Sequence, residues 1–292
     1  MILRLRPRWA DRSVGLHDRP PRAIDPRRPP VFPFWEAVIQ PLLVAAEPRR
    51  VLEIGALRGD TTIALLDQLG PSSELHVVDP DPQFDPSEHE RRFAGRYVFH
   101  RATSHAVIPT LPTVDVALID GDHNWYTVVN ELRLLAERST ADAAPLPLLV
   151  LHDVAWPYGR RDGYYAPERI PAEHRQPCSP GGIHRDRDAL DPDGGLNRHM
   201  HNAEHAGGPR NGVLTALEDF ATEYPDGLRT VVLPVFVGLA VAVTDARLAA
   251  APGLGPVIDE LASPDGLARV EAAAREALRA RLAGPPEGGR DA

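Results

Sequence analysis

Two short stretches of this 292-residue chain place carboxylates beside imidazoles, each directly after an apolar run. Asp120 and His123 belong to the first stretch, and His152 and Asp153 belong to the second. Such groups can hold a hard divalent cation such as Mg²⁺, which lowers the pKa of a bound hydroxyl, or an imidazole can act as a general base. We therefore predict that all four residues are catalytic and that Asp120 and Asp153 are metal ligands. The alternative is a structural Asp–His group that caps neighbouring helices.

A glycine-containing loop forms a second candidate site. Gly55 follows the apolar run 50–54 and permits a tight turn, while Gly59 opens a helical pattern over 60–69 and lets the backbone approach a ligand. Asp79 ends the next apolar run, where a carboxylate can accept hydrogen bonds from ribose hydroxyls. Together these residues predict a nucleoside-binding site. The glycine spacing is not the G-x-G-x-x-G of dinucleotide-binding folds, which weighs against the alternative of an NAD-dependent oxidoreductase.

These motifs resemble those of the class I S-adenosylmethionine-dependent methyltransferases. The loop at residues 53–60, the acidic strand end at Asp79 and the string at residues 118–123 are similar to successive motifs of that superfamily. The last string, followed by Tyr126, resembles a bacterial branch that methylates small molecules in natural-product and sugar modification. The resemblance covers residues 34–243 and implies S-adenosylmethionine as the cofactor.

The resemblance also implies roles for individual residues. The implied cofactor-binding residues are Glu53, Gly55, Gly59, Asp79, Thr103, Ser104 and Asp120. Glu53 would stand near the amino group of the methionine part, the two glycines would pass under that part, and Asp79 would hold the ribose. Members of the superfamily often have an acidic residue before Ser, near the adenine amino group, where this chain has Thr103 and Ser104.

Metal-dependent O-methyltransferases similarly place acidic ligands after the same two strands. Asp120 and Asp153 match these positions, whereas His152 stands where that pattern has another acid. The resemblance therefore implies methylation of a small-molecule hydroxyl, on a sugar or natural product, with either a divalent metal or a histidine base activating the hydroxyl. The rival hypothesis is a catalytically silent nucleoside-binding or assembly module with the same fold.

The surrounding pattern predicts elements that bring these side chains together. Apolar runs alternate with helical patterns, which favours a parallel, doubly wound sheet whose strand ends meet at one edge. The expected strands of this part are 50–55, 75–78, 97–99, 114–119 and 146–151. The runs 229–233 and 235–243 are separated only by Pro234, so they must be antiparallel neighbours. With the seven strands that the resemblance implies, we predict an α/β, Rossmann-like, doubly wound sheet that is mostly parallel with an antiparallel last strand.

Composition divides the chain into segments. Residues 1–33 are rich in proline and are expected to be an irregular arm, residues 34–245 to be the methyltransferase domain, and residues 246–292 to be a helical tail. Residues 154–210 are rich in Pro, Gly, Arg and Asp and show no sustained period. We therefore predict a long lid insertion after the fifth strand, mobile without ligand.

Aromatic and basic residues near the start of this insertion allow two interpretations. The aromatic rings of Trp156, Tyr158, Tyr164 and Tyr165 could stack on a sugar or ring-shaped acceptor while Arg160 or Arg161 pairs with an acid group. Alternatively, these residues only anchor the insertion to the domain.

Composition excludes several classes of function. All 32 basic residues are Arg, so Schiff-base lysine and Walker-lysine chemistry are excluded, and a formal net charge of −9 argues against a nucleic-acid partner. The single cysteine excludes an internal disulfide and a Cys-rich metal site. No apolar run is long enough to span a membrane, and the first residues lack the apolar part of a signal peptide. We expect a cytoplasmic enzyme with a small-molecule acceptor and no membrane partner. The tail helix could pack on its own domain or on a second copy, so a homo-oligomer is an open alternative.

Overall fold

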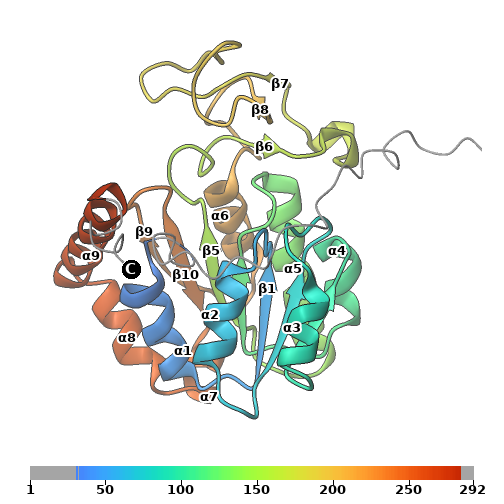
Figure 1. Ribbon diagram of the computed structural model, residues 1–292, viewed down its shortest axis with the longest axis vertical. Helices are drawn as coiled ribbons and strands as arrows, with labels where there is room; N and C mark the ends of the chain where they lie inside the picture. The colour runs from blue at the N-terminus through green and yellow to red at the C-terminus, as the bar shows by residue number, and fades with distance from the viewer. Residues whose placement is uncertain (1–30, 32, 284–292) are drawn as a thin grey trace, which may run out of the picture.

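A sheet of seven strands organises the chain (Figure 1). It is seen in a computed structural model that describes Val31 and residues 33–283. The strands lie in the order β3-β2-β1-β4-β5-β10-β9. Their bounds are β1 Arg50–Ile54, β2 Glu74–Val78, β3 Tyr97–His100, β4 Val116–Ile119, β5 Leu148–His152, β9 Arg229–Leu233 and β10 Leu239–Val243. Strands β1 to β5 are parallel, and β10 is antiparallel to both of its neighbours. This Rossmann-like arrangement confirms the predicted fold class.

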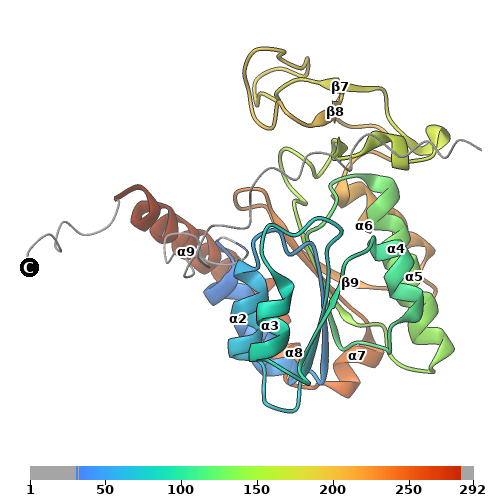
Figure 2. The same cartoon turned by 45° about the vertical axis from the view of Figure 1, so that its right-hand side comes forward.

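Helices cover both faces of the sheet because its strands are apolar on both sides. Their bounds are α1 Gln40–Ala46, α2 Asp60–Gln68, α3 Pro86–Arg92, α4 Ser104–Val107, α5 Trp125–Ala141, α6 Val213–Glu223, α7 Asp245–Ala250, α8 Leu254–Leu261 and α9 Pro264–Ala283. Figure 2 shows α2, α3 and α8 on one face and α4, α5 and α6 on the other. One apolar core joins Leu52 and Leu151 to the α5 residue Leu132. A second joins Val51 and Val77 to helices on the opposite face.

The C-terminal helices pack on the sheet domain. Ile258 of α8 and Val270 of α9 are buried in the same apolar core as Leu42 of α1. The apolar stripe of the tail is therefore used within the chain. The irregular arm expected over residues 1–33 lies outside the described residues, apart from Val31 and Pro33.

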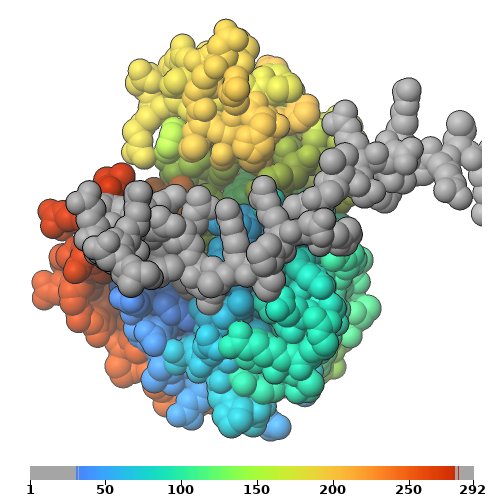
Figure 3. All heavy atoms as spheres, viewed as in Figure 1, coloured from blue at the N-terminus to red at the C-terminus, as the bar shows by residue number. Residues whose placement is uncertain are grey.

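The insertion at residues 154–210 contains regular structure that its composition did not predict. Its three-stranded sheet has the order β6-β8-β7, with β6 Gly163–Tyr164, β7 Cys178–Pro180 and β8 His201–Ala203. In Figure 3 the insertion forms a lobe (yellow) of its own at one end of the molecule. Tyr164 and Met200 are buried within it. Strands of two or three residues are too short to show a hydrophobic period, which is why the sequence of the insertion gave no sign of them.

Over the part of the chain that the structure describes, no helix combines the length and the apolar character needed to cross a membrane.

Candidate active site

Asp120, His123, His152 and Asp153 meet at the carboxyl ends of β4 and β5. His152 Nδ1 lies 3.1 Å from Asp120 Oδ1 and 3.0 Å from Asp153 Oδ2. His123 Nε2 lies 2.9 Å from the same Asp153 oxygen. The structure therefore brings together the four residues that the sequence placed after two separate strands. We call them the Asp–His cluster.

Asp153 is the centre of the Asp–His cluster. Its backbone is left-handed, with a φ of 59°, which a non-glycine residue rarely adopts and which often marks a functional position. Burial acts to raise the pKa of Asp153, but the neighbouring His123 and His152 outweigh it and hold that pKa far below its ordinary value. The carboxylate therefore stays ionised and accepts from both imidazoles.

Both imidazoles favour the protonated form. Burial acts to lower the pKa of His123 and His152, but the nearby carboxylates outweigh it, chiefly Asp153 for His123 and Asp120 for His152. Both pKa values end above the ordinary value, His152 by the larger amount. The far ring nitrogens, His123 Nδ1 and His152 Nε2, are buried without a hydrogen-bond partner among the described residues.

Asp120, His152 and Asp153 also fit a divalent metal ion. One ligand atom from each lies within 4.8 Å of the others, and within the described residues this is the one group of three or more His, Cys, Asp or Glu side chains so arranged. Neighbouring ligands of an octahedral ion with bonds of about 2.1 Å lie about 3 Å apart. The separations of 3.0 and 3.1 Å around His152 Nδ1 match that spacing. An imidazole among carboxylates suits borderline transition metals better than Mg²⁺, which prefers oxygen ligands.

The glycine loop lies directly against the Asp–His cluster. Gly55 has a φ of +86°, and a Cβ atom there would lie 2.2 Å from the carbonyl oxygen of Asp120. Only glycine therefore lets the loop after β1 pack on the backbone after β4. Gly59, with a φ of +78°, precedes the first residue of α2. A ligand held by this loop would lie beside Asp120.

Asp79 braces the glycine loop from the end of β2. Its Oδ2 accepts hydrogen bonds from the Ala56 and Leu57 amides at 2.9 and 2.8 Å, and its Oδ1 accepts from the Asp81 amide at 2.8 Å. Each carboxylate oxygen can accept two bonds, so Oδ1 keeps capacity for a further donor. The geometry thus gives Asp79 a role in loop shape that the sequence did not indicate.

One protein-family model matches the segment that contains all of these site residues. A family model described as "Methyltransferase domain" matches residues 52–154, which include the glycine loop, Asp79 and the complete Asp–His cluster. By this match, residues 52–154 form a methyltransferase domain. A sequence comparison with curated proteins gave no match.

Solved structures of methyltransferases share part of the fold at low identity. A methyltransferase from Geobacter sulfurreducens is 14% identical over 70% of this chain and 76% of its own, with a TM-score of 0.39. The O-methyltransferase TomG from Streptomyces achromogenes, solved with S-adenosylmethionine, is 14% identical over 70% and 78%, with a TM-score of 0.38. An O-methyltransferase from Bacillus cereus, solved with SAH, is 17% identical over 71% and 79%, with a TM-score of 0.40. These values are too low to support an argument about the reaction.

Glu53 of the methyltransferase domain is buried beneath the loop. The Thr62 hydroxyl of α2 donates to its Oε2 at 2.6 Å, and Oε1 has no partner among the described residues. Burial raises the pKa of Glu53 to about 8. The carboxyl is therefore largely neutral at neutral pH, whereas the expected contact with a cofactor amino group calls for an anion.

Thr103 and Ser104, expected near the adenine, lie at the start of α4. Thr103 precedes the helix without a side-chain hydrogen bond to it, while the Ser104 hydroxyl donates to Glu131 of α5 at 2.5 Å. Burial raises the pKa of Glu131 to about 8. Sequence reasoning missed Glu131, although an acidic residue on the apolar face of a helix was a signal that could have found it.

Arg160 and Arg161 anchor the insertion rather than facing the site. Arg160 forms a two-bond ion pair with Glu218 of α6 at 2.5 and 2.7 Å. Arg161 is buried and donates to the Asp188 side chain and to two backbone carbonyls. Tyr164 is also buried, whereas Tyr165 is 62% exposed, with its ring centroid 5.7 Å from that of His123. Among Arg160, Arg161, Tyr164 and Tyr165, Tyr165 is therefore the one residue placed to contact a methyl acceptor at the Asp–His cluster.

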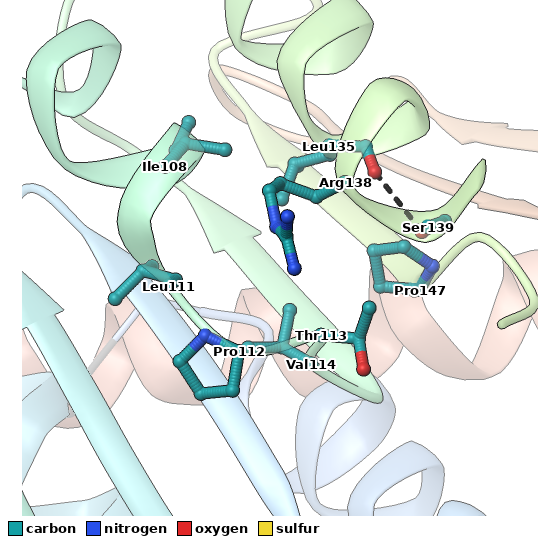
Figure 4. A pocket seen from close by; sticks show the side chains of 9 residues that line it. All are labelled: Ile108, Leu111, Pro112, Thr113, Val114, Leu135, Arg138, Ser139 and Pro147. Carbon is teal, nitrogen blue, oxygen red and sulfur yellow. Dashed lines mark hydrogen bonds between the residues drawn. The ribbon is translucent and has the colours of Figure 1, made fainter. Parts of the chain in front are cut away.

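A small cavity elsewhere in the domain does not compete with this site. It measures about 10 Å³ and lies before β4 and β5, at the opposite ends of these strands. Figure 4 shows the Arg138 side chain reaching across it from α5. That volume holds about one water molecule, so it cannot take a nucleoside.

Proposed function

We propose that the protein transfers the methyl group of S-adenosylmethionine to a hydroxyl oxygen of a small molecule, with a divalent metal activating that hydroxyl. The bond from the methyl carbon to sulfur breaks as the bond to oxygen forms, and S-adenosylhomocysteine leaves. The hydroxyl proton must be lost in or before this step, because a neutral hydroxyl is a weak nucleophile. The protein therefore has to align donor and acceptor and stabilise the oxyanion.

One observation carries this proposal. The backbone of Asp120 packs on Gly55 of the cofactor loop, while its side chain joins His152 and Asp153. A methyl donor on the loop and an acceptor oxygen at the Asp–His cluster would thus be neighbours. A silent module would not need such a cluster, and the glycine spacing of the loop weighs against an NAD-dependent oxidoreductase.

Asp120, His152 and Asp153 would hold the metal, whose binding would displace the proton from His152 Nδ1; when bound, the metal would lower the pKa of the acceptor hydroxyl. His123 donates to Asp153 at 2.9 Å and so fixes the direction of that carboxylate. We propose Mn²⁺, an oxygen-binding cation that tolerates an imidazole ligand better than Mg²⁺ does, in place of the Mg²⁺ that an all-oxygen site would select.

A histidine base is the second candidate for activating the hydroxyl. The raised pKa of His123 counts against it, because it favours the protonated imidazole, which cannot accept the acceptor proton. His123 would act as a base only once the pH exceeds that raised pKa.

Metal removal and return tests the proposal. Methyl transfer from labelled S-adenosylmethionine to a panel of phenols and sugar alcohols should stop after chelation and return with Mn²⁺ more fully than with Mg²⁺. Calorimetric titration of the chelated protein with Mn²⁺ should show one site. That site should be lost in Asp120→Asn and Asp153→Asn but kept in Asp142→Asn, an exposed ion-pair residue of α5.

Other outcomes select the alternatives. Full activity after chelation, with a loss of about 10² to 10⁴ in rate for His123→Ala, would favour the histidine base. S-Adenosylmethionine binding without transfer to any acceptor of the panel would favour a silent module. Binding of NAD without S-adenosylmethionine would overturn the proposal.

A further inference from the structure

The insertion is joined to the domain at a fully buried carboxylate, Asp162, that sequence reasoning did not single out. Its Oδ1 accepts hydrogen bonds from the Trp125 amide and the Gly212 amide, both at 2.7 Å. Its Oδ2 accepts from the Tyr164 hydroxyl at 2.6 Å. Trp125 is the first residue of α5, and Gly212 directly precedes α6. One side chain therefore ties β6 to the N-terminal ends of two helices.

Three donors converge on this group, which explains why it is a carboxylate. An ionised carboxylate only accepts hydrogen bonds, whereas an amide side chain would direct an NH₂ group at one of the donors. Tyr164 cannot reverse its role without loss, because its oxygen already accepts from the Gln176 amide at 2.9 Å. Burial raises the pKa of Asp162 to about 6, so the group still ionises at neutral pH.

The residue after Asp162 holds the Asp–His cluster. The Gly163 amide donates to the carbonyl oxygen of His123 at 2.9 Å. A Cβ atom at Gly163 would lie 2.4 Å from the Tyr158 ring, so the backbone of β6 passes directly over that ring. The same ring lies with its centroid 5.0 Å from that of His123. His123 is thus fixed from both its backbone and its ring by the start of the insertion.

We propose that Asp162 is a positioning residue of the methyltransferase: it fixes β6 on the N-terminal ends of α5 and α6, and Gly163 thereby keeps the His123 imidazole on Asp153. Its purpose in catalysis rests on the proposed function, while the network of contacts does not. The same anchor sets the place of Tyr165, which follows the hydrogen-bonded Tyr164 and faces His123.

The competing interpretation is a cap that stabilises the fold and nothing more. Under that interpretation, loss of Asp162 lowers the free energy of unfolding without changing the folded site. Asp188 supplies the matched control, because it also anchors the insertion, accepting from the Ala206 amide at 2.8 Å and from Arg161, but has no hydrogen bond to the Asp–His cluster.

The experiment compares Asp162→Asn with Asp188→Asn in the full chain. In protein with labelled histidines, the hydrogen-bonded His123 ring N–H should give a slowly exchanging signal, identified by its loss in His123→Gln. We expect Asp162→Asn to abolish or broaden that signal and to speed backbone amide exchange around His123 by about tenfold or more. Asp188→Asn should leave both unchanged. Both variants should keep the S-adenosylmethionine affinity of the parent, since neither residue touches the glycine loop.

Either of two results would overturn the proposal: an unchanged His123 signal and exchange rate in Asp162→Asn, or the same change in both variants. If Asp162→Asn does not fold, Tyr164→Phe replaces it, because this change removes one donor and keeps the carboxylate; it should broaden the His123 signal. These measurements need no acceptor. If the parent protein transfers no methyl group, the proposed function fails while the positioning role is still decided. Where transfer is found, Asp162→Asn should lower kcat more than it raises KM.

Discussion

Asp79 braces the glycine loop through two backbone amides, those of Ala56 and Leu57, so its effect on a cofactor includes the shape of the loop. We predict that Asp79→Ala weakens S-adenosylmethionine binding by about 10- to 100-fold, because both the ribose acceptor and the loop brace are lost. Asp79→Asn should weaken S-adenosylmethionine binding less than Asp79→Ala does, because the amide side chain keeps one acceptor oxygen. Calorimetric titration measures both. The control Asp85→Ala removes an exposed cap of α3 and should bind as the parent does.

Gly55 and Gly95 form a matched pair, since both have a positive φ but different surroundings. A Cβ atom at Gly55 would overlap the backbone of Asp120, whereas nothing lies within 4 Å of one at Gly95. Gly95→Ala should therefore cost about 1 kcal/mol of unfolding free energy from backbone strain alone. Gly55→Ala should cost about 3 kcal/mol or more and remove cofactor binding. Equal losses in urea unfolding would contradict this difference.

At the residue scale, the sequence predicted the Asp–His cluster well and its supports poorly. The four members follow two apolar runs, and parallel strands place such ends together. Asp162 could not be found in the same way, because its amide donors are 37 and 50 positions away. Ser104 and Glu131 are similarly 27 positions apart. Hydrogen bonds between distant loops leave no period in a sequence.

Among the elements, the insertion joins a tightly bound base to an exposed tip. Asp162 and Tyr164 are buried at the base, whereas Arg185, Arg187 and Arg198, in the connection between β7 and β8, are exposed. We predict that trypsin cuts the free protein at these three arginines and spares Arg161. Cofactor together with acceptor should slow this cutting, as expected of a lid. Uniform resistance in the free protein would argue against a lid.

The sheet shows which elements a sequence can predict. The run at residues 146–151 is apolar throughout, and β5 is indeed buried on both faces, because its neighbours and the helices cover it. The closely spaced runs at the end of the domain form the predicted antiparallel pair. The strands of the insertion depend instead on buried polar residues such as Asn202, whose side chain donates to Gly181 and Asn197 carbonyls. Such long-range contacts override a local pattern that points to a loop.

For the whole molecule, buried acids determine how stability varies with pH. Burial raises the pKa of Glu53 and of Glu131 from 4.5 to about 8, so the folded chain binds these protons more tightly than the unfolded chain. Their contribution to stability is complete below the unfolded pKa and is lost as the pH rises through about 8. One pKa unit corresponds to about 1.4 kcal/mol, so we predict a loss of a few kcal/mol between about pH 5 and pH 9.

Glu131→Gln should flatten this dependence, because the amide imitates the neutral acid beside Ser104. Urea unfolding at a series of pH values measures the effect. Glu137→Gln changes an exposed residue of the same helix, so its free energy of unfolding should vary with pH as that of the parent does. A stability that rises with pH over this interval would contradict the account.

Hydrogen bonds at the base of the insertion join its first residues to its last residues. Asn211 accepts from the Asp162 amide at 2.6 Å and donates to the His205 and Gly207 carbonyls, so both ends of the insertion close on each other. Chain exchanged between Tyr165 and His201 would begin and end at a fixed pair of anchors, provided that it kept the core contacts of Ile183 and Met200 and the Asp188 partner of Arg161. We therefore predict that the exposed middle of the insertion tolerates exchange of residues better than its hydrogen-bonded base does.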